Sequence, residues 1–367
     1  MPPNHLAVYL SNRCNLNCKY CYVAINQGEP ALLTFEHLKA NIDYFFASVP
    51  GPLADKKITF LGGEPFLNFP LLQRAVDYVR ETAGPDLILQ TFTNGVNISQ
   101  EKLDWCASRR LYVTVSLDGM KATNDRVRVF WKDESRSVFD TVMQRLAGVR
   151  KDNLGVSLVF DSNSVGDLLK NIDFFYKQGF SRITFNPELY EIWPDEKVEL
   201  LKTVMAGFRR YYTTVLRSGA RPFTVPILFS VLDTERGGPS WWHECHNVVL
   251  GSDNKFYTCD KALSFPFAKL PDADVGGAAP GMEWEKRRAE LAEARAVVDQ
   301  SAGPEHRQYF CPMGVVFYSK YAKESPEKLL RNFTAVSDVF GNTLTELVNE
   351  LRDTPAFRAL YVEVNLV

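Results

Sequence analysis

The order of the secondary-structure patterns predicts an α/β protein, in which a partial (β/α)6 barrel of the TIM type precedes a small α+β domain. Short β-branched, apolar runs alternate with amphipathic helical patterns, and six such pairs occur before residue 219. The pattern then changes to a segment rich in proline, glycine and aromatic residues. We therefore expect a barrel domain at 1–218, a second domain at 219–320 and a helical C-terminal segment at 321–367.

The elements can be placed by residue number. The expected strands are residues 5–10, 57–61, 87–93, 111–117, 155–160 and 182–186. The expected helices include residues 71–82, 137–149, 165–178 and 195–217, and a pattern over 344–360 that is interrupted near Pro355. In βα barrels the chemistry takes place at the carboxyl ends of the strands, so the residues that follow each strand are the candidates for a site.

Composition excludes several classes of protein. The chain has 367 residues, 46% of them hydrophobic, which is enough for one large domain and a smaller one. The net charge of -2 gives no electrostatic case for nucleic acid. No apolar run reaches membrane-spanning length and the N-terminus lacks the regions of a signal peptide, so we expect a cytoplasmic protein and no membrane partner. Seven cysteines in a reducing compartment indicate metal rather than disulfides.

The most informative motif follows the first strand. Cys14, Cys18 and Cys21 are spaced C-x3-C-x2-C, so that one short loop can carry three thiolates around a compact centre. Three thiolates can hold a four-iron cluster and leave one iron open for a cofactor. A zinc site would need a fourth Cys or His at similar spacing, and His5 is the only histidine nearby. Zinc and reduced structural cysteines remain the alternatives at this point.

A second motif, Gly62-Gly63-Glu64-Pro65, follows the second strand. The two glycines would let another molecule approach the bare backbone, and Glu64 can accept a hydrogen bond from an ammonium group. Taken alone, Gly-Gly is typical of a turn that ends a strand. Together with the cysteine loop it resembles the radical S-adenosylmethionine (SAM) superfamily, which implies a [4Fe-4S] cluster on the three cysteines and SAM on the open iron, with its ammonium held by the Gly-Gly-Glu-Pro strand end.

The next two strands end in Thr-Asn-Gly and Ser-Leu-Asp-Gly, and an Asp-Arg-Val-Arg run follows. Single Asn-Gly and Asp-Gly pairs are usually turns. Radical SAM enzymes with peptide substrates carry similar motifs at these places. That resemblance implies that Ser116 contacts the methionine or ribose part of SAM, that Arg128 balances its carboxylate and that Tyr20 packs near its adenine. Asn94 and Asp118 complete the expected cofactor-binding set.

Three further cysteines lie in the C-terminal part of the chain, at Cys245, Cys259 and Cys311. Residues 252–255 have the composition of a hairpin turn, with Asn254 as the residue that best tolerates a positive φ after glycine. A hairpin would bring Cys245 and Cys259 together, and Cys311 would add a third thiolate from a distant loop.

This region resembles the auxiliary-cluster extension called SPASM when long and twitch when short. Asn254 stands at the glycine of its C-x9-15-G-x4-C signature, and the first gap is eight residues, one short. The resemblance implies a second, auxiliary [4Fe-4S] cluster of the twitch type. Its fourth position would be open or would be completed by a side chain from the set His243, His246, Asp260 and Cys106. Zinc or free cysteines are the alternatives, and Cys106 fits a buried structural thiol better.

The resemblance implies an activity. A reduced cluster would pass one electron to SAM, cleavage would give a 5'-deoxyadenosyl radical, and this radical would remove hydrogen from an unreactive C-H bond. An electron donor such as flavodoxin or ferredoxin would supply the reduced cluster. Because an auxiliary cluster can accept an electron from the product radical, we expect an oxidative outcome: dehydrogenation, a thioether or another crosslink. Asp260 and Glu188 are the candidate bases.

The motifs resemble most closely those of enzymes that modify peptides or protein side chains, including sulfatase maturases. Only thirteen residues precede Cys14, so we expect a leader peptide to be recognised by a separate protein or by the barrel itself. The rival hypothesis is a small-molecule dehydrogenase or cyclase. A hypothesis of another class is a non-catalytic iron-sulfur electron-transfer protein, against which the Gly-Gly-Glu-Pro motif argues.

Overall fold

The computed structural model describes residues 4–21, 23, 31–151, 154–188, 191–219, 221–235, 247–257, 260, 289, 291–293, 295–296 and 326–365. These residues fall into two compact units. The first unit contains the described residues within 1–116, 124–150 and 245–296. The second contains those within 117–123, 151–244 and 297–367.

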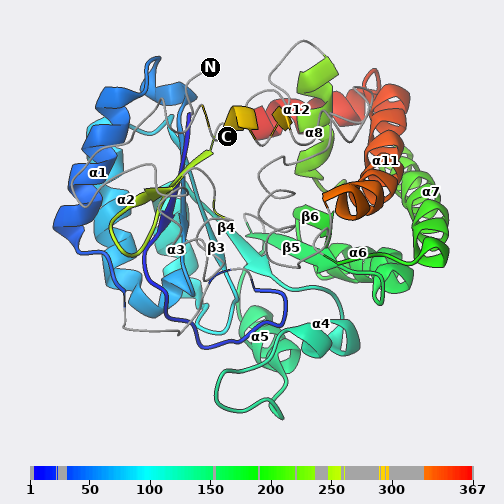
Figure 1. Ribbon diagram of the computed structural model, residues 1–367, viewed down its shortest axis with the longest axis horizontal. Helices are drawn as coiled ribbons and strands as arrows, with labels where there is room; N and C mark the ends of the chain where they lie inside the picture. Colours follow the sequence, from blue (N-terminus) through cyan, green and yellow to red (C-terminus); the bar gives the residue numbers. More distant parts are fainter. Residues whose placement is uncertain are drawn as a thin grey trace. The chain divides into compact units, whose positions relative to one another are not determined.

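The first unit is built on a sheet with the strand order β4-β3-β2-β1-β7-β8, in which all neighbours are parallel except β7 and β8 (Figure 1). Its strands are β1 (His5–Tyr9), β2 (Lys57–Leu61), β3 (Ile88–Thr93), β4 (Leu111–Ser116), β7 (Asn247–Leu250) and β8 (Phe256–Tyr257). Its α-helices are α1 (Phe35–Ser48), α2 (Phe69–Ala83), α3 (Gln100–Ser108) and α5 (Val138–Ala147), with 3-10 turns η1 (Leu53–Asp55) and η2 (Pro65–Asn68). Helix α4 (Lys121–Val127) includes residues of both units.

The sequence explains why these segments form strands and helices. In β1, the side chains of Leu6 and Val8 are completely buried and those of Ala7 and Tyr9 nearly so, because a parallel strand is covered on both faces. Helices α1, α3 and α5 begin after Thr34, Ser99 and Ser137, whose hydroxyl oxygens accept backbone N–H groups of the first turn. Helices α1 and α2 pack side by side along the sheet (Figure 1).

The second unit contains the parallel pair β5 (Leu154–Phe160) and β6 (Arg182–Pro187). Its helices are η3 (Val165–Asp167), α6 (Leu168–Lys177), α7 (Asp195–Arg217), α8 (Pro226–Glu235), α11 (Pro326–Leu351) and α12 (Pro355–Asn365). Helix α11 packs against α7 and α8. Phe185 of β6 lies between these layers, with its ring centroid 4.8 Å from Phe208 of α7 and 5.9 Å from Phe340 of α11. An aromatic core therefore joins the strands to the helices.

The six predicted βα units are present in the predicted order, β1 to β6. The strand ends differ from expectation by one residue at most, and the long helix at 195–217 has the predicted bounds. The predicted helix 165–178 consists of η3 and α6, and the helical pattern near the C-terminus is interrupted between Leu351 and Pro355 as expected, because proline fits the first turn of the next helix. Among the described residues, no helix combines the length and apolarity needed to cross a bilayer.

The predicted hairpin at residues 252–255 is confirmed. Strands β7 and β8 pair antiparallel, and Asn254 has φ 65° in the turn between them. Its side-chain oxygen accepts from Nδ2 of Asn41 at 2.8 Å, which ties the turn to α1. The sequence did not reveal that β7 also extends the sheet of the first unit as the parallel neighbour of β1. Nδ1 of His5 in β1 lies 2.6 Å from Oδ1 of Asn247 in β7. The domain boundaries at 218 and 320 stay a prediction.

The hairpin turn offers a stability test. Asn254→Gly relieves the left-handed backbone and loses the bond to Asn41, so we expect a cost of about 1 kcal/mol or less. Asn254→Val places a β-branched residue at positive φ and should cost on the order of 2 kcal/mol or more. Urea unfolding followed by circular dichroism measures both. Equal costs for the two variants would show that the φ value of Asn254 does not constrain the turn.

Candidate active site

The cysteine loop is attached on one side to the end of β2. The backbone N–H of Gly63 donates to Ser11 O at 2.8 Å, and the N–H of Glu64 donates to Arg13 O at 2.9 Å. These bonds continue the pairing of β1 with β2 beyond the ends of both strands. The residues immediately before Cys14 are therefore fixed by the Gly-Gly-Glu-Pro motif itself.

The two glycines are required by this contact. A Cβ atom on Gly63 would lie 2.1 Å from Arg13 O and 2.9 Å from Cys14 N, and one on Gly62 would lie 2.8 Å from Ser11 O. No real side chain tolerates such distances to backbone atoms. The sequence indicated that the bare backbone lets another molecule approach; the close approach that the structure shows is made by the cysteine loop of the same chain.

On its other side the cysteine loop pairs antiparallel with residues 127–131. The N–H groups of Asn17 and Lys19 donate to Val129 O and Val127 O, each at 2.8 Å, and Trp131 N donates to Asn15 O at 3.0 Å. This strand-like segment was not predicted from the sequence. The β-branched and aromatic residues of Val-Arg-Val-Phe at 127–130 are the signal that could have revealed it.

The three thiols of the loop are partly exposed and are not joined in a disulfide. Cys18 and Cys21 line a cavity of about 270 Å³, together with Val23, Val129 and Trp131. Burial raises the pKa of the Cys14 thiol to about 12, so a thiolate at this place requires compensation by donors or by a cation. Among the residues that the structure describes, no three His, Cys, Asp or Glu side chains are grouped as ligands of a single metal ion.

Hydrogen-bond donors point at two of the sulfur atoms. Leu16 N lies 3.3 Å and Asn94 Nδ2 lies 3.6 Å from Cys14 Sγ. Arg128 Nη1 lies 3.9 Å from Cys18 Sγ. Donors stabilise sulfur as a thiolate, which is the form that binds metal. Three thiols from one loop, with donors directed at two of them, fit the ligand set of an iron-sulfur cluster.

Glu64 is the buried centre of the site. Its Oε1 accepts from Phe66 N at 2.9 Å and from the hydroxyl of Thr93 at 2.6 Å, and its Oε2 accepts from Asn94 N at 2.7 Å. Burial raises the pKa of this carboxyl, and the hydrogen bonds oppose that shift. The carboxylate thus joins the ends of β2 and β3, and its remaining acceptor capacity lies on Oε2. Pro65 is buried directly after it, at the start of η2.

Arg128 and Tyr20 lie together, with the guanidinium carbon 5.5 Å from the centre of the tyrosine ring. The Asp-Arg-Val-Arg run that contains Arg128 is anchored by its first residue. Asp125 accepts from the hydroxyl of Ser137 at 2.5 Å and from Phe139 N at 2.8 Å, at the start of α5. Asp125 therefore positions the segment that pairs with the cysteine loop.

The Ser-Leu-Asp-Gly motif spans the boundary between the two units. Ser116 is the last residue of β4, in the first unit. Asp118 belongs to the second unit, where its buried Oδ1 accepts from Val159 N of β5 at 3.0 Å. Gly119 has φ 147°, which residues with a side chain rarely adopt, and a Cβ there would lie 2.3 Å from Nδ2 of Asn171, so glycine is favoured here as well. The expected contacts of Ser116 and Asp118 with SAM stay predictions.

The remaining predicted site residues are Glu188, Asp260 and four cysteines. Glu188 follows β6, where its N–H donates to Phe160 O at 2.7 Å and its carbonyl accepts from the indole N–H of Trp193 at 2.8 Å. Asp260 is partly buried and follows β8 by three residues. Cys245, Cys259 and Cys311 lie outside the described residues. Cys106 is 1% exposed, and burial raises its thiol pKa to about 12, as expected for a structural thiol.

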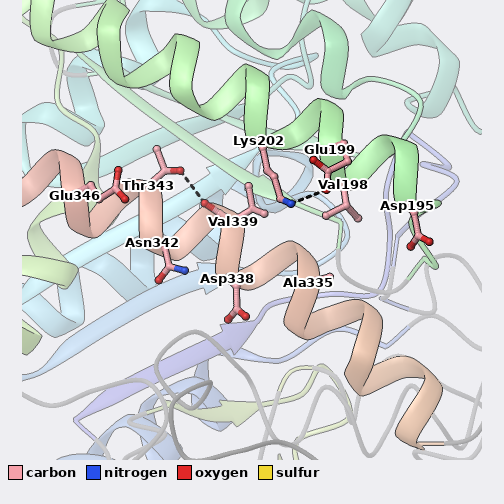
Figure 2. Close-up of a pocket in the computed structure, with 10 residues that line it drawn as sticks. All are labelled: Asp195, Val198, Glu199, Lys202, Ala335, Asp338, Val339, Asn342, Thr343 and Glu346. Atoms are coloured by element: carbon pink, nitrogen blue, oxygen red, sulfur yellow. Dashed lines mark hydrogen bonds and ion pairs between the residues drawn. The ribbon is translucent and has the colours of Figure 1, made fainter.

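A larger groove lies in the second unit between α7 and α11 (Figure 2). Its volume is about 690 Å³, and its charged lining is mostly acidic: Asp195, Glu199, Asp338 and Glu346, with Lys202. Lys202 Nζ pairs with Glu199 at 2.5 Å, and Glu346 pairs with Arg209 of α7. None of the predicted site residues lines this groove.

The contact between the Gly-Gly-Glu-Pro motif and the cysteine loop can be tested by adding one methyl group at Gly63. Gly63→Ala should displace Arg13 and Cys14 and reduce the iron that the loop retains after anaerobic reconstitution by at least half. Gly148→Ala is the control, because a Cβ there meets nothing closer than 3.8 Å. Full iron content in the Gly63 variant would show that the loop tolerates a displaced backbone.

Comparison with known proteins gives several relatives, among them these three. Uncharacterized protein MJ0907 of Methanocaldococcus jannaschii is 29% identical over 61% of this chain and 74% of its own length. Fe-coproporphyrin III synthase of Methanosarcina barkeri is 32% identical over 49% of this chain. The cysteine-type anaerobic sulfatase-maturating enzyme of Clostridium novyi is 24% identical over 48% of this chain. The matched segments span 43% and 49% of the last two proteins, so less than half of each.

Solved structures resemble nearly the whole chain. A histidine-tagged form of anSMEcpe with bound AdoMet has a TM-score of 0.73 at 17% identity, over 98% of both chains. Native anSMEcpe with bound AdoMet and the Cp18Cys peptide has a TM-score of 0.71 at 17% identity, over 95% of this chain and all of the other. The likeness confirms the predicted fold class, the partial barrel.

The family model that matches the chain is the radical SAM superfamily, over residues 8–186. This range begins in β1, contains the cysteine loop and the Gly-Gly-Glu-Pro motif, and ends in β6. Radical SAM proteins use a [4Fe-4S] cluster and SAM, which agrees with the ligand set and donors described above. Residues 8–186 therefore form a radical SAM domain.

Proposed function

We propose that this radical SAM enzyme removes hydrogen from a peptide or protein side chain and thereby starts an oxidative modification: a crosslink, a thioether or a dehydrogenation. The observation that carries the proposal is the likeness to peptide-bound anSMEcpe over 95% of the chain, which extends beyond the radical SAM domain at 8–186.

In this proposal the loop thiols of Cys14, Cys18 and Cys21 hold the cluster. With SAM bound, the cluster would supply the one electron that cleaves SAM, and the carbon radical released from SAM would abstract a hydrogen atom. The protein's part is to hold the thiolates, orient the cofactor and exclude other hydrogen donors. The donors at 3.3 Å and 3.6 Å from Cys14 Sγ and the double backbone attachment of the loop support the first of these tasks.

The proposed contacts with SAM come from both sides of the cysteine loop. Glu64 would take the ammonium on the unused acceptor side of Oε2, next to the bare backbone of Gly62, Gly63 and the buried Pro65. Arg128 would face the carboxylate and Tyr20 the adenine; their 5.5 Å contact supports a shared binding region. Asn94, Ser116 and Asp118 complete the proposed set.

The proposed oxidative outcome depends on the C-terminal cysteines. Cys245, Cys259 and Cys311 would hold an auxiliary [4Fe-4S] cluster that takes the electron of the product radical. The β7–β8 hairpin supports this proposal, because it lies between Cys245 and Cys259 in sequence and turns at Asn254. Asp260 and Glu188 are the proposed bases, and a protein donor such as flavodoxin or ferredoxin is the proposed source of electrons.

A small-molecule substrate is the second candidate. The observation that favours it is the sequence match to Fe-coproporphyrin III synthase, whose name refers to a porphyrin and not a peptide. That match covers 49% of this chain, whereas the structural likeness to peptide-bound anSMEcpe covers 95%. We therefore place the peptide substrate first.

Iron and sulfide content test the cofactor part of the proposal. After anaerobic reconstitution we expect about eight irons per chain, falling to about four when Cys14, Cys18 and Cys21 are all replaced by alanine. A native content of about four that falls to none would remove the auxiliary cluster. Zinc in place of iron in the native protein would refute the proposed ligand set altogether.

The substrate class is tested by SAM cleavage. The reconstituted enzyme is reduced with dithionite, supplied with SAM and with either the Cp18Cys peptide or coproporphyrin III, and 5'-deoxyadenosine is quantified. We expect the peptide to stimulate 5'-deoxyadenosine formation and to lose about 2 Da, the mass of two hydrogens. Stimulation by the porphyrin alone would favour the small-molecule hypothesis. No SAM cleavage under any condition would favour an electron-transfer protein.

A further inference from the structure

The carboxamide of Asn94 has one possible orientation. Its Oδ1 accepts from Val96 N at 3.0 Å, which identifies the oxygen end of the group. Nδ2 therefore faces the cysteine loop, where it donates to Asn15 Oδ1 at 2.7 Å and lies 3.6 Å from Cys14 Sγ. An amide nitrogen carries two hydrogens, so both contacts can be made at once.

Asn94 is also held firmly in place. Its backbone N–H donates to Glu64 Oε2 at 2.7 Å, and the preceding Thr93 donates to Oε1 of the same carboxylate at 2.6 Å. Its side chain is 7% exposed. A donor that is fixed and shielded from water interacts more strongly with a charge than one on the surface, because the local dielectric is low.

Arg128 occupies an equivalent place beside the second cysteine. The residue is 8% exposed, Nη1 lies 3.9 Å from Cys18 Sγ, and the guanidinium packs on the ring of Tyr20. Its neighbours Val127 and Val129 are the residues that pair with the cysteine loop, so the backbone holds it in register with Cys18. A guanidinium stays charged at all pH values of interest.

These contacts have a common electrostatic consequence. Reduction of a [4Fe-4S] cluster adds one electron, so it adds one negative charge to the cluster and its thiolates. N–H donors and a cation next to the sulfur atoms stabilise this more negative state, and hydrogen bonds to the sulfurs are among the factors that set cluster potentials. An amide donor at one cysteine and a guanidinium at another act in the same direction.

We propose that Asn94 and Arg128 are positioning residues that raise the reduction potential of the cluster bound by Cys14, Cys18 and Cys21. The step concerned is the uptake of one electron by the oxidised cluster from a low-potential one-electron donor, with no bond formed or broken. This role is separate from any contact of the two residues with SAM. It rests on the proposed cysteine ligands and is independent of the substrate class.

The test is a redox titration without SAM. The reconstituted protein is titrated anaerobically with dithionite, and the cluster signal that is missing from the Cys14, Cys18, Cys21 triple alanine variant is followed by electron paramagnetic resonance. Asn94→Asp keeps the shape and the acceptor for Val96 N but replaces the donor by an anion. Arg128→Gln removes the cation. We expect each to shift the oxidised-to-reduced ratio about tenfold, which is about 59 mV toward more negative potential.

Matched controls separate this effect from loss of stability. Asn41→Asp makes the same change at a residue that is 2% exposed and donates to His37 O and Asn254 Oδ1 instead of sulfur. Arg136→Gln removes a guanidinium whose carbon lies 4.6 Å from the centre of the Phe130 ring. Both controls should keep the native potential.

The outcomes are decisive in either direction. Native potentials in both variants at full iron content would overturn the proposal, and so would equal shifts in the controls. If Asn94→Asp does not retain iron, Asn94→Ser removes the amide without adding charge, and an unchanged potential in Asn94→Ser and Arg128→Gln would again refute it. Absence of iron from the native protein would refute the ligand set instead, which distinguishes the two failures.

Discussion

The backbone pairing of the cysteine loop on both of its sides is the constraint on which the rest of the site depends. Gly63 and Glu64 hold the residues before Cys14, and residues 127–131 hold those after it. A loop with three partly exposed thiols has little apolar surface of its own to bury, so its geometry has to come from its neighbours. Hydrogen bonds along both sides supply that geometry.

The close approach on the β2 side depends on the absence of side chains. Because Gly63 lacks a Cβ, the backbone of Arg13 can lie where a methyl group would be. Glu64 then secures the same region from within, since its buried carboxylate receives donors from its own turn and from the end of β3. The Gly-Gly-Glu-Pro motif, which the family resemblance associates with SAM, thus also has a structural role. The two roles are compatible because Oε2 of Glu64 can accept a further hydrogen bond.

The interactions around the loop also link local structure to chemistry. Asp125 anchors the segment that carries Arg128, and Glu64 fixes Asn94, so both of these side-chain donors to cysteine sulfur depend on a buried or half-buried carboxylate. Replacing Asp125 or Glu64 would therefore disturb a donor that belongs to another residue, Arg128 or Asn94. Polar residues at the ends of two strands, Glu64 after β2 and Asn94 after β3, therefore act together on one loop.

The sequence by itself determined the six βα units, the cysteine loop, the Gly-Gly-Glu-Pro strand end and the hairpin turn at Asn254, because hydrophobic period, cysteine spacing and turn chemistry are local properties of the chain. Only the tertiary structure decided that Gly63 contacts Arg13, that residues 127–131 pair with the cysteine loop, that β7 joins β1, and that Asn94 and Arg128 face sulfur atoms. These contacts join residues up to 242 positions apart, such as His5 and Asn247. A local sequence pattern does not indicate which distant segments come into contact.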